Sequence, residues 1–262
     1  MAKFDAEYYR QFRPYYPVTT FAGLQNTLLT RGLMRPFRVA DIGCGTGHSA
    51  ISLLKSGFDG RIIGIDPDEK MLAQARRLTE LHQMSEIEFQ LGSAEALPIS
   101  SGTIDAVLIG SAFHWFEWRR TSEEMLRILK PQGVLRIFEY QFPKAPDCPA
   151  LNEWIRRQFN LNWKAPQQKP RGSFFQMTEV FRKDARWASL GQGKPPMVMN
   201  LTGDDLAGHL FSQSRVLCYE ETLPSAEKAV FRAGVRKTVC SFFQEKTLAF
   251  DFKLSWFEFG KR

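Results

Sequence analysis

Apolar residues over the first 140 positions recur in two alternating patterns. Short apolar or alternating runs, typical of strands, fall at 38–42, 61–65, 86–91, 104–109 and 134–139. Between them, apolar residues return at the spacing of a helix face, at 48–55, just after residue 67, and at 123–129. Strands that alternate with helices of this length predict βαβ units, and therefore a doubly wound α/β fold with helices on both faces of a parallel sheet.

The pattern changes after residue 140. Segments 151–159, 204–211 and 226–243 predict helices, and segments 197–201 and 248–259 predict two late strands. With these two strands the sheet would be seven-stranded and mostly parallel. Ligands of such sheets bind beyond the carboxyl ends of the strands, so the residues that follow each strand are the candidates for a site.

A glycine-rich loop, DIGCGTG at Asp41–Gly47, connects the first predicted strand to the first predicted helix. Glycine lets a backbone turn sharply and approach a ligand closely, and the helix that follows presents free N–H groups. The dinucleotide fingerprint GxGxxG would need a third glycine where this chain has His48, and the nucleoside triphosphate loop would need a Lys-Ser/Thr pair. The loop therefore argues against a nicotinamide dehydrogenase and against a triphosphate site.

An acidic residue, Asp66, ends the second predicted strand. A carboxylate at this position accepts hydrogen bonds from both ribose hydroxyls of a nucleoside. The alternative is that Asp66 caps the helix opened by Pro67, with Glu69 completing a capping box. Both roles are compatible.

Polar residues also follow the third predicted strand, in the run LGSAEALP. The hydroxyl of Ser93 and the backbone N–H of Ala94 are placed to read an adenine edge. Glu95 either belongs to the same site or is an ordinary acid at a helix start.

These motifs occur in a definite order: VADIGCGTG, IGIDPDEKML, LGSAEALP, IDAVLIGSAFHWF and LRILKPQGVL. This order resembles the class I S-adenosylmethionine-dependent methyltransferases. The N-terminal pattern Tyr9-x-x-x-Arg13-Pro14-x-Tyr16-Pro17 and the run FHWF at 113–116 are similar to the methyltransferase type 11 group, near trans-aconitate methyltransferase. The resemblance covers about residues 4–140 and is weak over 141–262.

The resemblance implies a Rossmann-like enzyme that uses S-adenosyl-L-methionine and releases S-adenosyl-L-homocysteine. Asp41 and the glycine loop would hold the methionine part of the cofactor, and the residues after the second and third strands would hold its ribose and adenine. The implied cofactor-binding residues are Asp41, Gly43, Cys44, Gly45, Thr46, Gly47, Asp66, Pro67, Ser93, Ala94, Glu95 and Ser111. The family often has Asp at the position of Ser93; because a hydroxyl is the weaker acceptor, we expect a lower cofactor affinity.

The loop after the fourth strand, residues 109–115, faces the transferred methyl group in this fold. It has no Asn-Pro-Pro-Tyr-like run and no Pro-Cys pair, which argues against methylation of nucleic-acid bases. No metal is expected, because the carboxylates do not form a magnesium cluster and the four histidines lack metal-ligand spacing. His114 is the candidate general base, since histidine titrates near neutrality; alternatively, His114 and Trp115 only form the wall of a pocket.

The candidate acceptor-binding residues are Tyr9, Arg13, Tyr16, Phe113, His114 and Trp115. The resemblance implies that the segment before the first strand folds over the cofactor and closes the pocket. Arg13 would pair with a carboxylate of the cofactor or the acceptor, or would pack its stem on tyrosine rings at the surface.

We expect a single methyltransferase domain over residues 1–262, with four parts. These are an N-terminal lid (1–37), a cofactor-binding core (38–140), a basic cap of helices and loops over the strand ends (141–195), and late strands and helices that rejoin the sheet (196–262).

The formal net charge of +7 lies entirely in the second half of the chain. Residues 1–140 contain 16 Lys/Arg and 16 Asp/Glu, whereas residues 141–262 contain 19 and 12. Segment 155–195 holds nine basic residues, which are Arg156, Arg157, Lys164, Lys169, Arg171, Arg182, Lys183, Arg186 and Lys194. This asymmetry predicts an anionic partner or substrate, or else is a solvated basic surface.

Apolar runs, the N-terminal segment and the cysteines indicate in which compartment the protein is expected. No run of about 18 apolar residues predicts a spanning helix, the N-terminus lacks the apolar core of a signal peptide, and the four cysteines show no CxxC spacing. The sequence is therefore interpreted as that of a reduced, cytoplasmic protein without a membrane partner.

The leading hypothesis is methyl transfer to a small molecule, at an oxygen of an anionic or aromatic metabolite. The basic segment favours the anionic acceptor, and the aromatic content, with 22 Phe, 6 Trp and 6 Tyr, allows a flat one. The alternatives are an RNA or protein methyltransferase that uses the 155–195 face, and a cofactor-binding protein without turnover. Nucleic acid is disfavoured because no separate binding module is visible, and the sequence does not determine the oligomeric state.

Overall fold

The computed structural model describes residues 5–163, 174–244 and 246–262. They fall into two compact units, each assembled from separate stretches of the chain. The sheet unit comprises Tyr15–Tyr140, Arg171–Pro195 and Leu254–Arg262, and the helical unit comprises Met1–Pro14, Gln141–Pro170 and Pro196–Lys253. No helix among the described residues is both long and apolar enough to span a bilayer.

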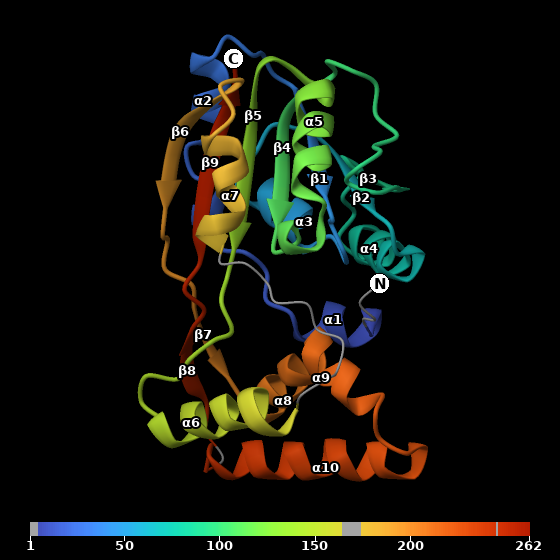
Figure 1. The fold of residues 1–262 in the computed structure, drawn as a ribbon, viewed down its shortest axis with the longest axis vertical. Helices are drawn as coiled ribbons and strands as arrows, with labels where there is room; N and C mark the ends of the chain where they lie inside the picture. The colour runs from blue at the N-terminus through green and yellow to red at the C-terminus, as the bar shows by residue number, and fades with distance from the viewer. Residues whose placement is uncertain (1–4, 164–173, 245) are drawn as a thin grey trace. The chain divides into compact units, whose positions relative to one another are not determined.

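The sheet unit contains one seven-stranded sheet, in the order β3-β2-β1-β4-β5-β9-β6 (Figure 1). Pairing is parallel from β3 through β5, whereas β9 is antiparallel to both of its neighbours. The strands are β1 (Phe37–Ile42), β2 (Gly60–Asp66), β3 (Ile87–Leu91), β4 (Ile104–Gly110), β5 (Leu129–Glu139), β6 (Trp187–Gly193) and β9 (Ser255–Lys261). This confirms the predicted doubly wound, mostly parallel sheet.

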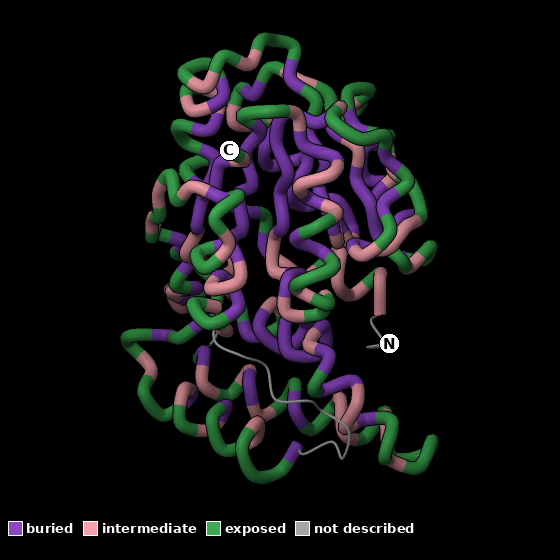
Figure 2. Tube along the Cα trace, turned by 45° about the horizontal axis from the view of Figure 1, so that its top comes forward, coloured by how far each residue is buried: buried purple, intermediate pink, exposed green. Residues whose placement is uncertain are grey.

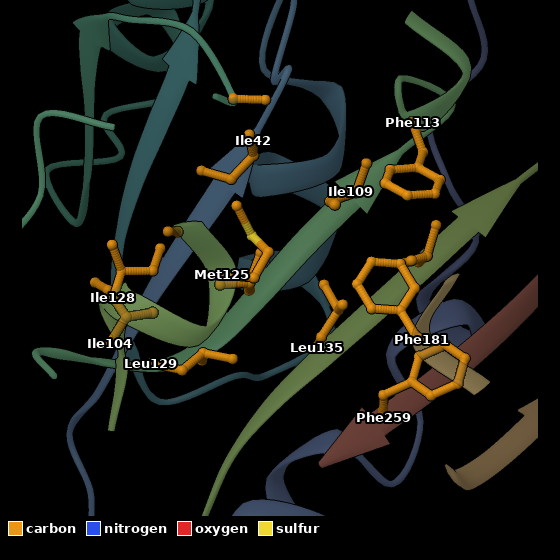
Figure 3. Packing of buried hydrophobic residues seen from close by; sticks show 14 of the residues in the cluster. Ile42, Ile104, Ile109, Phe113, Met125, Ile128, Leu129, Leu135, Phe181 and Phe259 are labelled. Atoms are coloured by element: carbon orange, nitrogen blue, oxygen red, sulfur yellow. The ribbon is translucent and has the colours of Figure 1, made fainter. Parts of the chain in front are cut away.

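Helices cover both faces of this sheet. They are α2 (Leu24–Thr30), α3 (His48–Lys55), α4 (Glu69–Leu81), α5 (Trp118–Ile128) and α7 (Phe174–Arg182), with the 3₁₀ turns η1 (Val18–Phe21) and η2 (Phe113–Trp115). On one face, Met125 and Ile128 of α5 and Phe181 of α7 pack on the strands in a single apolar cluster (Figure 3). The buried residues follow the central strands (Figure 2).

The opposite face holds a buried ion pair. Arg136 on β5 is 1% exposed and donates from Nε to Glu258 on β9, at 2.8 Å. It also donates from Nη1 to the carbonyl oxygen of Thr20 in η1, at 2.9 Å, and Thr27 of α2 donates to Glu258, at 3.1 Å. A buried charge pair of this kind is tolerated only with further hydrogen bonds, and here those bonds attach η1 and α2 to the sheet.

The helical unit has its own small core. Its elements are α1 (Ala6–Phe12), α6 (Pro149–Arg157), the π-helical turn η3 (Gln158–Asn162), α8 (Gly203–Phe211), α9 (Ser214–Glu220), α10 (Ser225–Ser241), and an antiparallel pair, β7 (Val198–Leu201) with β8 (Leu248–Asp251). Helix α1 packs on α8 at Gly208, where a Cβ atom would lie 2.2 Å from the ring of Phe12. Only glycine permits so close an approach.

The division into parts differs from the expected one. Helix α7 and strand β6 belong to the sheet unit and not to a cap, because Phe181 and Trp187 are buried in the main apolar cluster. Of the late strands only β9 rejoins the sheet, while β7 and β8 pair with each other. The expected lid divides at Pro14–Tyr15 between the two units. Lys164, Lys169 and Arg171 of the basic segment lie outside the described residues.

Candidate functional site

The glycine loop between β1 and α3 is shaped by left-handed glycines. Gly43, Gly45 and Gly47 have φ angles of +69°, +55° and +82°, which other residues rarely adopt. A Cβ atom on Gly43 would lie 2.6 Å from that of Ala112, in the loop after β4. The N–H of Gly43 donates to the carbonyl oxygen of Ile65 on β2, at 2.7 Å. The loop is therefore fixed between the ends of β2 and β4.

Asp66 links this loop to the end of β2. Its Oδ2 accepts from the N–H of Gly45 at 2.9 Å, and its Oδ1 accepts from the N–H of Asp68 at 3.0 Å. Asp68, and not Asp66, is the N-cap of α4, since its side chain accepts from the N–H of Lys70 at 2.9 Å. The helix-capping interpretation of Asp66 is therefore wrong. Pro67 lies exposed between the two acids.

The carboxylate of Asp66 is 9% exposed, and burial raises its pKa while the two backbone N–H groups oppose that rise. Each of its oxygens accepts one backbone hydrogen bond in the structure and has a second lone pair. The carboxylate can therefore take two further donors.

Asp41 lies at 0% exposure near the end of β1. Its Oδ2 accepts from the hydroxyl of Ser49 in α3, and its Oδ1 has no hydrogen-bond partner among the described residues. Burial raises the pKa of this carboxyl to about 7, and the neighbouring Asp66 adds to the rise. A buried oxygen without a donor is costly, so it marks a place where a donor from a ligand would be favoured.

The raised pKa of Asp41 predicts that the free energy of unfolding depends on pH. Between the ordinary Asp pKa near 4 and the folded value of about 7, the folded protein binds a proton that the unfolded chain has lost. Asp41 therefore stabilises the fold fully at low pH, and this contribution disappears as pH rises through about 7. We expect the free energy of unfolding to fall by roughly 2–3 kcal/mol between pH 5 and pH 8 on this account.

Chemical denaturation of the wild type and of Asp41→Asn at the two pH values measures this effect. The pH dependence should be smaller in Asp41→Asn by about the same 2–3 kcal/mol. An identical pH dependence in the two proteins would exclude Asp41 as its source.

The loop after β3 holds the three residues expected near an adenine. Ser93 forms an isolated bridge with Ala96, whose N–H donates to the Ser93 carbonyl oxygen at 3.2 Å. Ala94 is 5% exposed and its methyl group joins the apolar cluster. Glu95 does not start a helix; its Oε1 accepts from the N–H of Glu117 at 2.9 Å and so joins this loop to the start of α5.

The turn η2 directs its three side chains differently, because a 3₁₀ helix rotates about 120° per residue. Phe113 is 2% exposed, with its ring 5.4 Å from that of Phe181, and it points into the core (Figure 3). This burial favours a packing role for Phe113, because the core encloses its ring, and contact of Phe113 with the acceptor stays a prediction. Trp115 is 45% exposed, and His114 lies between these extremes.

Ser111 and Tyr16 meet at the end of β4. Ser111 has a φ of +51°, an uncommon conformation for a residue with a side chain, and strain of this kind concentrates at functional sites. The hydroxyl of Tyr16 donates to Ser111 Oγ at 2.9 Å, and the Tyr16 ring packs edge-on to Phe138 at 4.7 Å. Tyr16, Ser111 and His114, which the sequence places at the candidate site, all belong to the sheet unit.

Tyr9 and Arg13 belong to the helical unit instead. The Arg13 guanidinium lies over the Tyr9 ring at 4.7 Å and donates to the carbonyl oxygen of Ser212 at 3.2 Å. Packing on a tyrosine ring agrees with the alternative interpretation of Arg13. Pairing with a carboxylate of a ligand stays a prediction.

One residue of the site was absent from the sequence interpretation. Glu139 is the last residue of β5, and its Oε1 lies 3.8 Å from Nδ1 of His114. Ligands of parallel sheets bind beyond the carboxyl ends of the strands. An acidic residue at the end of the predicted strand 134–139 could therefore have been recognised from the sequence, as Asp66 was.

The described basic residues of segment 155–195 are paired or exposed. Arg156 bonds to Glu153 at 2.6 Å, and Arg186 bonds to Glu123, also at 2.6 Å. Arg182 lies over the ring of Phe257 at 4.8 Å. Arg157, Lys183 and Lys194 are exposed. Exposed pairs contribute little energy, so these contacts favour an ordinary charged surface over a concentrated anion site.

Within the described ranges, no group of three or more His, Cys, Asp or Glu side chains could hold a metal ion. The glycine cradle, the unpartnered Asp41 oxygen and the available Asp66 lone pairs instead fit an organic ligand. A nucleoside with free hydroxyls and a cationic end has the donors that these acceptors require.

Comparison with known proteins agrees with this chemistry. Residues 39–133 match the family model described as a methyltransferase domain. An uncharacterized methyltransferase of Mycobacterium tuberculosis is 35% identical over 98 residues, which cover 37% of each chain. The demethylmenaquinone methyltransferase of Lactococcus lactis is 33% identical over 122 residues, covering 46% of this chain and 48% of that one. The aligned part thus spans less than half of these relatives.

Solved structures extend the similarity of fold to nearly the whole chain. A protein of Anaeromyxobacter dehalogenans, provisionally described as a type II methyltransferase, has a TM-score of 0.65 at 19% identity, covering 95% of this chain and 97% of that one. A Haemonchus contortus phosphoethanolamine N-methyltransferase, solved with S-adenosylhomocysteine, has a TM-score of 0.54 at 16% identity, covering 98% and 56%. These likenesses show the Rossmann-like fold of methyltransferases, and residues 39–133 are similar to a methyltransferase domain. None supports the expected similarity to trans-aconitate methyltransferase.

Proposed function

We propose that this protein transfers a methyl group from S-adenosylmethionine to an oxygen of a small anionic or aromatic molecule. The observation that carries the cofactor assignment is the Asp66 carboxylate, held by the N–H groups of Gly45 and Asp68 at the junction of β2 and the glycine loop. Fixed in this way, it needs no rearrangement to accept two ribose hydroxyls. Asp41 and the loop Gly43–Gly47 would hold the methionine part, and Ser93 with the N–H of Ala94 would hold the adenine.

The bound cofactor would supply an activated methyl group on a sulfonium. The protein then has to hold the acceptor oxygen in line with that methyl group, and such positioning alone can account for much of the acceleration. The residues available for this task are Ser111, His114 and Trp115, which follow β4, and Glu139, which ends β5. Tyr16 fixes the loop after β4 through its hydrogen bond to Ser111.

Replacing Asp66 by alanine tests the cofactor assignment. Asp66→Ala removes an ionised acceptor for two hydroxyls, and we expect the binding free energy of S-adenosylhomocysteine to weaken by about 1.5–3 kcal/mol. Titration calorimetry measures the dissociation constant directly.

Asp68→Ala is the matched control, two residues away. It removes the N-cap of α4, and we expect it to lower the free energy of unfolding by about 1 kcal/mol while cofactor affinity stays unchanged. Equal dissociation constants in Asp66→Ala and the wild type would contradict the ribose assignment, and failure of the wild type to bind S-adenosylhomocysteine would contradict the proposed function itself.

A further inference from the structure

His114 and Glu139 lie at the carboxyl edge of two adjacent parallel strands, β4 and β5. Side chains alternate along a strand, so Glu139 is on the same face of β5 as Ile137, two residues before it. Ile137 belongs to the apolar cluster that also encloses Phe113, the neighbour of His114. Turn η2 and the end of β5 thus bring an imidazole and a carboxylate together, with Nδ1 of His114 3.8 Å from Oε1 of Glu139.

The surroundings strengthen this pairing. The His114 side chain is 7% exposed and that of Glu139 is 27% exposed, so solvent and salt screen their interaction less than at an open surface. The ring of Trp115 packs beside that of His114, with 4.9 Å between the ring centroids. A fixed carboxylate near an imidazole stabilises the protonated ring.

We propose that Glu139 is a positioning residue that sets His114 as general base, and that the acceptor oxygen belongs to a hydroxyl group and not to a carboxylate. This inference rests on the proposed function and names the substrate class of the same site. A carboxylate is already ionised at neutral pH, with an ordinary pKa near 4, and needs no base. A hydroxyl must lose its proton, and a histidine paired with a carboxylate is suited to take it.

Methyl transfer to a hydroxyl exchanges a carbon–sulfur bond for a carbon–oxygen bond and moves one proton. A lone pair of the acceptor oxygen forms the new bond to the methyl carbon, and the carbon–sulfur bond breaks with its electron pair staying on sulfur. The sulfonium thereby becomes a neutral thioether. The hydroxyl proton passes to Nε2 of His114, because Nδ1 is the nitrogen near Glu139. The resulting imidazolium faces the Glu139 carboxylate until the proton leaves to solvent.

Other titratable groups lie along the same edge of the sheet, namely Asp41 near the end of β1, Asp66 at the end of β2 and Tyr16 near Ser111. Burial places the pKa of Asp41 at about 7, within the range in which histidine titrates. A rate profile against pH would therefore mix the two, and the test must follow the His114 ring itself.

The first experiment titrates that ring by nuclear magnetic resonance between pH 5 and pH 9, with S-adenosylhomocysteine bound. His114→Gln assigns the signal, Glu139→Gln tests the pair, and Glu88→Gln, at an exposed position of β3, is the matched control. We expect the titration midpoint to fall by about one pH unit in Glu139→Gln and to stay in place in Glu88→Gln.

Equal midpoints in wild type and Glu139→Gln, with S-adenosylhomocysteine bound, would overturn the pair and leave the proposed function intact. The calorimetric binding test decides the proposed function separately. The two failures are therefore distinguishable.

The second experiment uses 4-hydroxybenzoic acid and 4-hydroxycinnamic acid, which carry a hydroxyl and a carboxylate on one molecule. With labelled S-adenosylmethionine, the expected main product is the methyl ether, and kcat should fall at least about tenfold in Glu139→Gln with little change in KM. A methyl ester as the main product, or an unchanged kcat in Glu139→Gln, would overturn the hydroxyl assignment.

Discussion

His114→Ala is expected to lower kcat by about 10²–10⁴-fold, because a positioned general base contributes that much to proton removal. The measurement is methyl transfer from labelled S-adenosylmethionine to the hydroxybenzoic acid probe. Affinity for S-adenosylhomocysteine should stay unchanged, since His114 is not among the residues that are proposed to hold the cofactor.

His82→Ala is the matched control, at the exposed C-cap of α4, and should leave kcat and KM as in the wild type. If His114→Ala instead raises KM and leaves kcat within a few fold of the wild type, His114 forms only the wall of the pocket. That outcome would favour a carboxylate acceptor, which needs no base.

Phe113→Ala is expected to lower the free energy of unfolding by about 3–5 kcal/mol, the usual cost of removing a buried phenylalanine ring. The ring is 2% exposed and lies against Phe181 of α7, so its loss leaves a cavity between η2 and α7. Urea denaturation followed by circular dichroism measures the change.

Trp115→Ala removes a larger ring two positions away and should cost under about 1 kcal/mol, since Trp115 is 45% exposed. The contrast between the two variants separates a core residue from a surface residue in one turn. A cost below 1 kcal/mol for Phe113→Ala would instead favour contact of Phe113 with the acceptor.

The parallel half of the sheet could be predicted because each of its signals is local. The strand at 38–42 and the helix at 48–55 were placed to within one residue, and Asp66 was found from its position at a strand end. Helix α5 was predicted to begin at residue 123, yet it begins at Trp118, because Glu117 caps it with bonds to Arg119 and Arg120. A capping acid without the usual Ser or Thr motif gives a weak sequence signal.

The parts that were not predicted depend on contacts between distant segments. Nothing near Trp187 indicates that β6 joins the main sheet, since its partner β9 lies at Ser255–Lys261. The direction of Phe113 depends on the 3₁₀ geometry of η2 and on Phe181, which comes 68 positions later. The pairing of His114 with Glu139 likewise requires the register of β4 on β5.

The repeated passage of the chain between the two units has a consequence for how the protein can be divided. The sheet unit receives β6 and β9 only from stretches that follow residues of the helical unit. A fragment ending at Tyr140, although it contains the whole segment matched as a methyltransferase domain, would leave the β5 edge unpaired. It would also leave Arg136 without Glu258, a buried cation without its anion. An open hydrophobic edge of that kind promotes aggregation. The proposed activity therefore has to be tested by point substitution and not by truncation.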